Sequence, residues 1–197
     1  MPSPRRLFVL DGHPAPDSLS AHFAQSYGQA AGAAGHEVRH AALSAMAFDP
    51  DFGATGFRDP KPLEPALVGF MADLAWAEHL VVLSPMWWGG MPAKLKGLFD
   101  RAFLPGAAFD PRIRKNHFPL PLLTGKTARF IVTSDTPPWF QRWIYRDAMG
   151  HQFRHQIAHF CGLKPARLTH FGPVETADAA RIATWRQKVE RLGAAGA

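Results

Sequence analysis

The most constraining feature of this sequence is the apolar run Leu80-Val81-Val82-Leu83, which leads through Ser84-Pro85 into a loop rich in tryptophan and glycine. Consecutive apolar residues that include valines are typical of a parallel strand covered on both faces. Pro85 predicts the end of that strand, because proline cannot extend a strand ladder. Pro92 fits the first turn of a following helix. The order of strand, short loop and helix predicts one unit of an α/β sheet.

The loop after this strand has the composition of a ligand-binding loop. Pro85 and Met86 precede Trp87, Trp88 and Gly89, and open α/β sheets bind their ligands at the carboxyl ends of strands. Glycine allows the backbone to approach a flat molecule closely. We expect a planar aromatic cofactor here; the alternative is that both tryptophans are ordinary core side chains.

Alternating periodicity along the chain predicts five strands and five helical segments. The strands are expected at 5–10, 36–43, 80–83, 126–134 and 168–171. The helices are expected at 18–34, 63–77, 92–103, in part of 139–161 with a break near Gly150, and at 182–192. Residues 46–65 and 104–124 are expected to be long loops, and no structure is expected from Gly193 onward.

Strands that alternate with helices predict a parallel sheet with helices on both faces. Right-handed crossovers leave the flavodoxin-like order 2-1-3-4-5 as the simplest doubly wound arrangement of five strands. A chain of 197 residues with 47% hydrophobic residues can bury roughly 70% of its unfolded surface. We therefore expect a single α/β domain over residues 1–197.

Charge and compartment signals favour a small anionic ligand. The net charge is +6, from 22 basic and 16 acidic residues, but the basic residues are spread along the chain, so nucleic acid is not an expected partner. No apolar run has the length of a secretory or membrane segment, so the protein is expected to be soluble and cytoplasmic. The single cysteine, Cys161, fits a buried apolar position.

The loop after the first strand has the features of a phosphate site. His13 lies in it, and Ser18 or Ser20 is the expected N-cap of the following helix, which ends at Gly35. Free N–H groups at a helix N-terminus attract anions. The alternative is that these serines only cap the helix. In a doubly wound sheet this loop and the tryptophan loop should face the same crevice.

Other phosphate and metal motifs are missing from the sequence. There is no G-x-G-x-x-G after the first strand and no Walker A motif, which excludes those two nucleotide-binding loops. The pair His151 and His155 has ligand spacing on a helix, but no third ligand accompanies it. No metal site is expected.

Two motifs carry a resemblance to a known family. They are Leu10-Asp11-Gly12-His13-Pro14 with Asp17-Ser18-Leu19-Ser20, and the segment 84–103. Together they resemble the NAD(P)H quinone oxidoreductase (DT-diaphorase-like) family of flavodoxin-fold flavoproteins, over about residues 5–171. The resemblance implies a homodimeric enzyme that holds FAD, or alternatively FMN, and reduces quinones with NADH or NADPH.

The resemblance also implies roles for individual residues. The flavin phosphates would be held by His13, Asp17, Ser18, Leu19 and Ser20, the flavin ring by Pro85, Met86, Trp87, Trp88 and Gly89, and its other edge by Thr133, Ser134, Asp135 and Thr136.

The loop after the fourth strand departs from the family pattern. Members related to DT-diaphorase carry paired glycines there and then a Tyr and a His that stabilise charge on the reduced flavin. This chain has neither glycine pair nor matching Tyr and His, and Tyr145 and His151 are the nearby residues with suitable chemistry. We expect these two to be the catalytic residues that handle the proton.

The implied chemistry is hydride transfer from NAD(P)H through flavin N5 to a quinone-type acceptor, with ping-pong kinetics because one pocket serves both substrates. Azo or nitroaromatic reduction would use the same chemistry. A non-catalytic flavin-binding subunit of an ion-efflux system is the alternative from another class. The aromatic and basic segment 137–146 fits a lid, a membrane-surface patch or dimer packing. The two long loops favour FAD over FMN.

Overall fold

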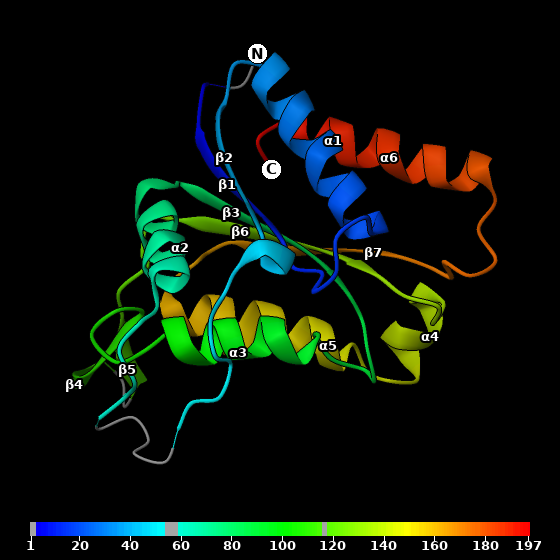
Figure 1. Cartoon of the computed structure of the whole chain (residues 1–197). Coiled ribbons are helices and arrows are strands. Elements are labelled where there is room, and N and C mark those ends of the chain that lie inside the picture. The colour runs from blue at the N-terminus through cyan, green and yellow to red at the C-terminus, as the bar shows by residue number, and fades with distance from the viewer. Residues whose placement is uncertain (1–2, 54–58, 116–117) are drawn as a thin grey trace.

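The computed structural model describes residues 3–53, 59–115 and 118–197. Its centre is a five-stranded parallel sheet (Figure 1). In spatial order the strands are β2 (Glu37–Ala42), β1 (Arg6–Asp11), β3 (His79–Pro85), β6 (Thr127–Thr133) and β7 (Ala166–Phe171). This is the predicted order 2-1-3-4-5, so the doubly wound fold is confirmed. No helix in the described ranges is both long and apolar enough to cross a bilayer.

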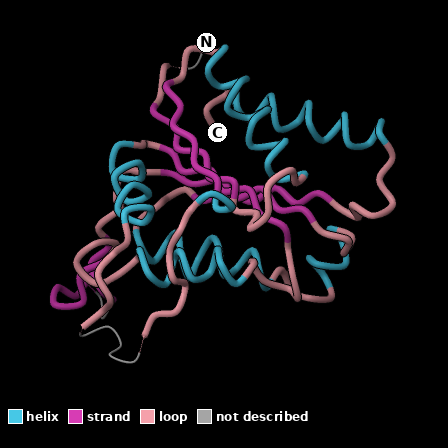
Figure 2. The backbone as a smooth tube through the Cα atoms, in the orientation of Figure 1, coloured by secondary structure: helices cyan, strands magenta, loops and turns pink. Residues whose placement is uncertain are grey.

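Helices cover both faces of the sheet in three layers (Figure 2). α1 (Leu19–Ala33) and α6 (Ala179–Ala194) pack together on one face. The other face carries α2 (Pro65–Trp76), α3 (Ala93–Ala102), α5 (Ala148–His151) and the π-helix η3 (Gln152–His159). Each face has its own apolar cluster.

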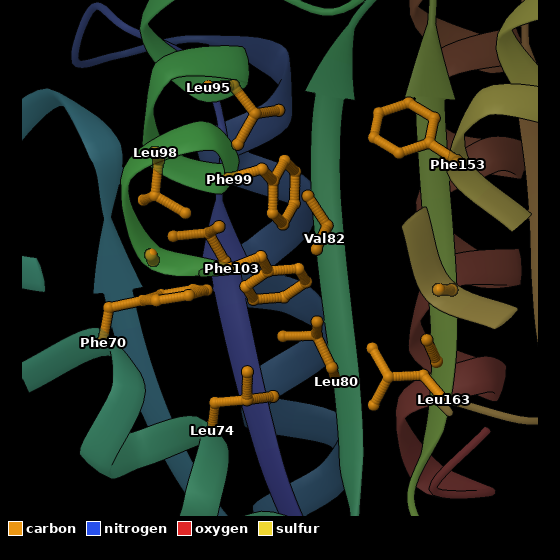
Figure 3. Close-up of a cluster of buried hydrophobic side chains, with 14 of the residues drawn as sticks. Phe70, Leu74, Leu80, Val82, Leu95, Leu98, Phe99, Phe103, Phe153 and Leu163 are labelled. Atoms are coloured by element: carbon orange, nitrogen blue, oxygen red, sulfur yellow. The ribbon is translucent and has the colours of Figure 1, made fainter. Parts of the chain in front are cut away.

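The central strand β3 supplies side chains to both clusters. Leu80 and Val82 belong to the cluster with α2 and α3, whereas Val81 and Leu83 belong to the cluster with α1 and α6. Figure 3 shows Leu80 and Val82 beside Phe99 of α3. Each such side chain contributes about 1.5–3 kcal/mol when it is fully buried. The continuous apolar run is therefore the sequence expression of a strand with no solvent face.

Gly12 holds the first loop against the third strand. Its N–H donates to the carbonyl oxygen of Leu83 at 2.7 Å. A Cβ at this position would lie 2.8 Å from the same oxygen and 2.9 Å from a methyl group of Leu95. Only glycine allows this approach without displacement of the backbone.

The predicted helix boundaries agree with the caps. Ser18 is the N-cap of α1, and its hydroxyl oxygen accepts from the N–H of Ala21 at 3.1 Å. Gly35 follows the helix with φ of +90°. Asp178 caps α6 in the same way, by accepting from the N–H of Arg181.

The expected loop 104–124 was wrong in part. It contains a two-stranded antiparallel sheet, β4 (Phe109–Lys115) with β5 (Phe118–Pro121), whose register shifts between Asp110 and Arg114. Prolines 111, 119 and 121 concealed these strands in the sequence. Each strand has only one partner here, and prolines are tolerated on strand edges and at bulges.

The segment 139–161 breaks at a different place from the one predicted. α4 (Pro138–Trp143) is followed by Arg146 and Asp147, both with positive φ, before α5 and η3 continue as one helical run. Gly150 lies inside this run. A Cβ there would lie 2.2 Å from a carboxylate oxygen of Asp147, so this glycine permits close packing and does not end the helix.

The glycine at 193 also has a packing role, because α6 runs on to Ala194 and the expectation of an unstructured tail from that residue was wrong. A Cβ on Gly193 would lie 2.3 Å from the carbonyl oxygen of Tyr27. The crossing of α1 and α6 therefore depends on this glycine.

A buried arginine fixes the expected loop 46–65. Arg101 of α3 is fully buried, and it donates to the backbone oxygens of Asp49 and Pro62 and to both carboxylate oxygens of Glu64. The described residues 46–53 and 59–64 contain no helix or strand, as predicted. Residues 54–58 of that expected loop lie outside the described residues.

Candidate functional site

The carboxyl ends of β1, β3 and β6 meet around one cavity of about 210 Å³. Its lining comes from the three loops that follow these strands and from one residue after β7. These residues are His13, Ser18, Leu19, Ser20, Pro85, Met86, Trp87, Thr133, Ser134, Asp135 and Val174. The predicted shared crevice therefore exists.

The loop after β1 is fixed by Asp11 and His13. One carboxylate oxygen of the buried Asp11 accepts from the N–H of His13 at 3.1 Å. Burial raises the pKa of Asp11, although this hydrogen bond opposes the rise. His13 Nδ1 accepts from the N–H of Ala15 at 3.0 Å. The ring of His13 then meets Trp87 edge to face, with centroids 5.6 Å apart, so the tips of the first and third strands are in contact.

The N-terminus of α1 faces the same cavity. Because Ser18 satisfies the N–H of Ala21, the N–H groups of Leu19 and Ser20 are the ones without a hydrogen-bond partner in the described part of the chain. Both residues line the cavity, and the first turn of α1 contains no acidic residue. This arrangement suits a phosphate group, since the free N–H groups and the helix dipole both favour negative charge.

The tryptophan loop is a tight turn on strained backbone. Trp87 and Gly90 exchange two backbone hydrogen bonds of 2.9 and 3.0 Å, and the central residues Trp88 and Gly89 have φ of +52° and +76°. Positive φ at both positions defines a type I′ turn. The turn consumes the N–H groups of Trp87 and Gly90, so the expectation that both glycines leave a free N–H was wrong for Gly90. Among the described residues, the N–H groups of Trp88 and Gly89 remain without a partner.

Trp88 is unusual in exposure as well as in conformation. Its relative exposure is 106%, so its ring makes almost no contact within the chain. A bulky residue in the left-handed region costs about 1–3 kcal/mol. Such strain clusters at sites that contact a ligand.

A second, larger cavity of about 600 Å³ adjoins the first. Met86, Ser134 and Asp135 line both. The remaining lining residues of the larger cavity are Trp88, Gly89, Thr136, Gln141, Tyr145 and Ala148. The pair of cavities forms one continuous site, with a helix N-terminus at one end and aromatic side chains at the other.

The loop after β6 is shaped by residues that follow β7. The hydroxyl of Ser134 lies 2.7 Å from His170 Nε2 and donates to the carbonyl of Thr136 at 3.0 Å. Asp135 accepts from the N–H of Glu175 at 2.7 Å. Sequence reasoning missed His170, Val174 and Gln141. The signal for the first two was topological, since the fourth and fifth strands are neighbours and their carboxyl ends lie together.

Two of the predicted site residues lie elsewhere. Asp17 is exposed with φ of +54°, and His151 is exposed with its ring centroid 5.1 Å from that of His155. Neither contributes to the lining of the two cavities, whereas Tyr145 does. Within the described residues, no cluster of three or more His, Cys, Asp or Glu side chains could hold a metal ion.

Comparison with known proteins decides the family. The family model described as "Flavodoxin-like fold" matches residues 5–192, which is almost the whole chain. The chain belongs to this flavodoxin-like family.

Curated relatives of this flavodoxin-like chain carry oxidoreductase names. It is 32% identical over 108 residues to the uncharacterized NAD(P)H oxidoreductase YcaK of Escherichia coli, which covers 53% of this chain and 55% of that protein. It is 30% identical over 127 residues to rat ribosyldihydronicotinamide dehydrogenase [quinone], which covers 59% and 52%. It is 37% identical over 84 residues to FMN-dependent NADH:quinone oxidoreductase 2 of Idiomarina loihiensis, covering 42% and 35%. The chain thus spans about half the length of the first of these relatives and less of others.

Solved structures resemble the flavodoxin-like chain over nearly its full length. The NAD(P)H:quinone oxidoreductase from Methanothermobacter marburgensis has a TM-score of 0.80 at 19% identity and covers 98% of both chains. The FMN-dependent NADH-azoreductase from Bacillus anthracis, solved in complex with FMN, has a TM-score of 0.72 at 13% identity and covers 96% of this chain and 97% of that one. At these identities the likeness shows the fold.

Proposed function

We propose that this protein is a flavin-dependent NAD(P)H oxidoreductase that reduces quinone-type acceptors. The observation that carries the proposal is the continuous double cavity at the carboxyl ends of β1, β3 and β6, with the N-terminus of α1 at one end. A flavin has the matching shape, an anionic tail joined to a planar ring. The names of the curated relatives support the same class of reaction.

The residues present fit a flavin. The N–H groups of Leu19 and Ser20 would hold a phosphate, and the segments 85–89 and 133–136 would enclose the ring. We propose FMN in place of the FAD implied by the family resemblance, because FMN is the flavin named in the relatives and neighbours described above. Mass spectrometry of the cofactor released by heat separates the two.

A bound flavin supplies a redox centre that accepts a hydride from NAD(P)H and passes the electrons to an acceptor. The chain supplies position and field. The free N–H groups of Trp88 and Gly89 face developing negative charge, and one such donor is worth about 3 kcal/mol in comparable sites. Because one cavity of about 600 Å³ would receive both substrates, we expect ping-pong kinetics.

The segment 137–146 forms part of the wall of the larger cavity. Gln141 lies on α4 and Tyr145 just after it, and both line the cavity, while Trp139 and Trp143 of α4 are exposed. We propose that α4 covers a planar aromatic acceptor. An azo compound would fit the same wall, and acceptor profiling with a quinone and an azo dye ranks the two.

We also propose that the protein is a homodimer through the face that carries α3 and η3. A cavity of about 340 Å³ on that face is lined by Phe99, Phe103 and Phe160, among others. Phe160 is 37% exposed and contacts Phe109. Sedimentation equilibrium of the wild type, with Phe160→Glu as the disrupting variant, tests this association.

The decisive experiment is anaerobic reduction. Protein loaded with FMN should be yellow, lose its absorbance on addition of NADPH or NADH, and regain it when a quinone is added. Protein that remains colourless after incubation with either flavin contradicts the whole proposal. Protein that binds flavin but never bleaches would instead support a non-catalytic flavin-binding role.

A further inference from the structure

Reduction of a quinone by NAD(P)H requires a proton, and the inference in this subsection, which rests on the proposed function, concerns its source. NAD(P)H, quinone and one proton give NAD(P)⁺ and hydroquinone. The hydride carries both electrons and one hydrogen, so the second hydrogen arrives as a proton. The sequence pointed to Tyr145 or His151 for this task, but His151 does not line either cavity.

Ser134 occupies the position that a proton donor needs. It lines both cavities. Its hydroxyl donates to the carbonyl of Thr136 at 3.0 Å and lies 2.7 Å from His170 Nε2. Since that hydroxyl proton points to Thr136, the short contact with His170 is made by an N–H on Nε2. The proton of the pair is therefore oriented from His170 toward Ser134.

A small polar hollow lies behind His170. It has a volume of about 10 Å³, close to the least space that admits one water molecule, and its lining includes His170, Gln141 and Asp147. Gln141 is only 4% exposed, and its amide oxygen has no partner among the described residues. A buried acceptor without a partner is costly. The hollow thus joins His170 to groups that can exchange protons.

Few charged or titratable groups face His170. Asp147, which pairs with Arg154 of η3, lies across the hollow. Asp135 and Tyr145 line the larger cavity on the side of Ser134. Burial lowers the pKa of His170, and Asp147 opposes this change by favouring the imidazolium.

We propose that Ser134 and His170 form the proton-donating pair of this cavity. The O–H bond of Ser134 breaks as a new O–H bond forms on the acceptor oxygen, while the His170 imidazolium passes its Nε2 proton to Ser134. His170 ends neutral and regains a proton from solvent. Ser134 is the catalytic residue, because it reaches the cavity surface, and His170 is the positioning residue that acts through it.

The first test is the pH profile of kcat/KM for a quinone. In the wild type this rate should fall toward tenfold per pH unit above the pKa of His170, since the donor is then lost. His170→Asn and Ser134→Ala should flatten the profile and lower the rate at acid pH by about 100-fold, as expected for loss of a general acid. His155→Asn, a change at an exposed histidine of η3, should keep the wild-type profile.

The second test does not depend on turnover. Proton NMR of the flavin-free protein should show the His170 ring titrating below its ordinary pKa, and Asp147→Asn should lower that pKa further. A His170→Asn variant with the wild-type pH profile would overturn the pair, as would a profile flattened by Tyr145→Phe alone. If the FMN-loaded wild type is never reduced by NADPH, the proposed function and the pair both fail; if it is reduced, only the pair is at stake.

Discussion

The two ends of β3 treat polar groups in opposite ways. At the amino end, His79 is buried next to Thr127, whose hydroxyl accepts from Arg5 at 3.0 Å and lies 2.6 Å from His79 Nδ1. Arg5 also donates to the carbonyl of Gly196 at 2.6 Å. The chain satisfies most of these groups internally. This end therefore contributes to stability.

At the carboxyl end, the same strand leads to groups that the chain leaves open. The N–H groups of Trp88 and Gly89 and those of Leu19 and Ser20 have no partner among the described residues, and the Trp88 ring is exposed. The contrast teaches that polar groups sealed within the chain serve the fold, whereas polar groups directed into a cavity are available to a ligand. Mutations at the two ends should therefore separate stability from binding.

The largest effect is expected from pH at the amino end. Burial and the nearby positive charges of Arg5, Arg129 and Arg167 lower the pKa of His79 to about 3. The unfolded chain binds that proton near pH 6.5, so stability is complete above pH 6.5 and is lost as pH falls toward 3, by about 1.4 kcal/mol per pH unit. Urea unfolding of the flavin-free protein should show a loss of about 2–3 kcal/mol between pH 7 and 4.5 from this group. His79→Gln should remove that part of the slope and His155→Gln should not; an unchanged slope in His79→Gln would refute the assignment.

Gly12→Ala should affect both properties, because it separates the first loop from β3. The added methyl group would lie 2.8 Å from the Leu83 oxygen, and such overpacking costs about 1–3 kcal/mol. Flavin affinity should fall as well, since His13 and Trp87 would lose contact. Urea unfolding and flavin titration measure the two effects. Gly32→Ala, where nothing lies within 4 Å, is the matched control, and equal behaviour of both variants would contradict the role of Gly12.

Ser18→Ala should cost about 1 kcal/mol of stability through loss of the N-cap. It should also weaken binding of FMN, because the disturbed turn carries the N–H groups that face the phosphate. Asp178→Ala removes the equivalent cap of α6 and should give a similar stability loss with unchanged FMN affinity. Equal FMN affinities in the two variants would place the phosphate elsewhere.

The smallest effect on stability is expected at Trp88, and it has the opposite sign. Trp88→Asn places an Asn-Gly pair in the type I′ turn that favours it, and should stabilise the flavin-free protein by up to about 1 kcal/mol. FMN affinity should decrease, because the exposed ring at the larger cavity is removed. Thermal unfolding and FMN titration measure both quantities. A destabilised variant with normal affinity would show that this ring serves the fold.

Much of this protein could be predicted from its sequence. The buried run at 80–83, the Ser18 cap and the alternation of strands and helices determined the parallel sheet and its order, because local periodicity and caps are short-range physical signals. Strand order then placed the loops after β1, β3 and β6 together. Most of the predicted site residues followed from that placement.

The tertiary structure alone decided the rest. The prolines of β4 and β5 concealed strand pairing that depends on a partner, and Gly150 and Gly193 proved to be sites of close packing. His170 reaches Ser134 across 36 residues, a contact that no local pattern encodes. Long-range neighbours determine which polar groups are satisfied, and in this chain they determine which remain available for chemistry.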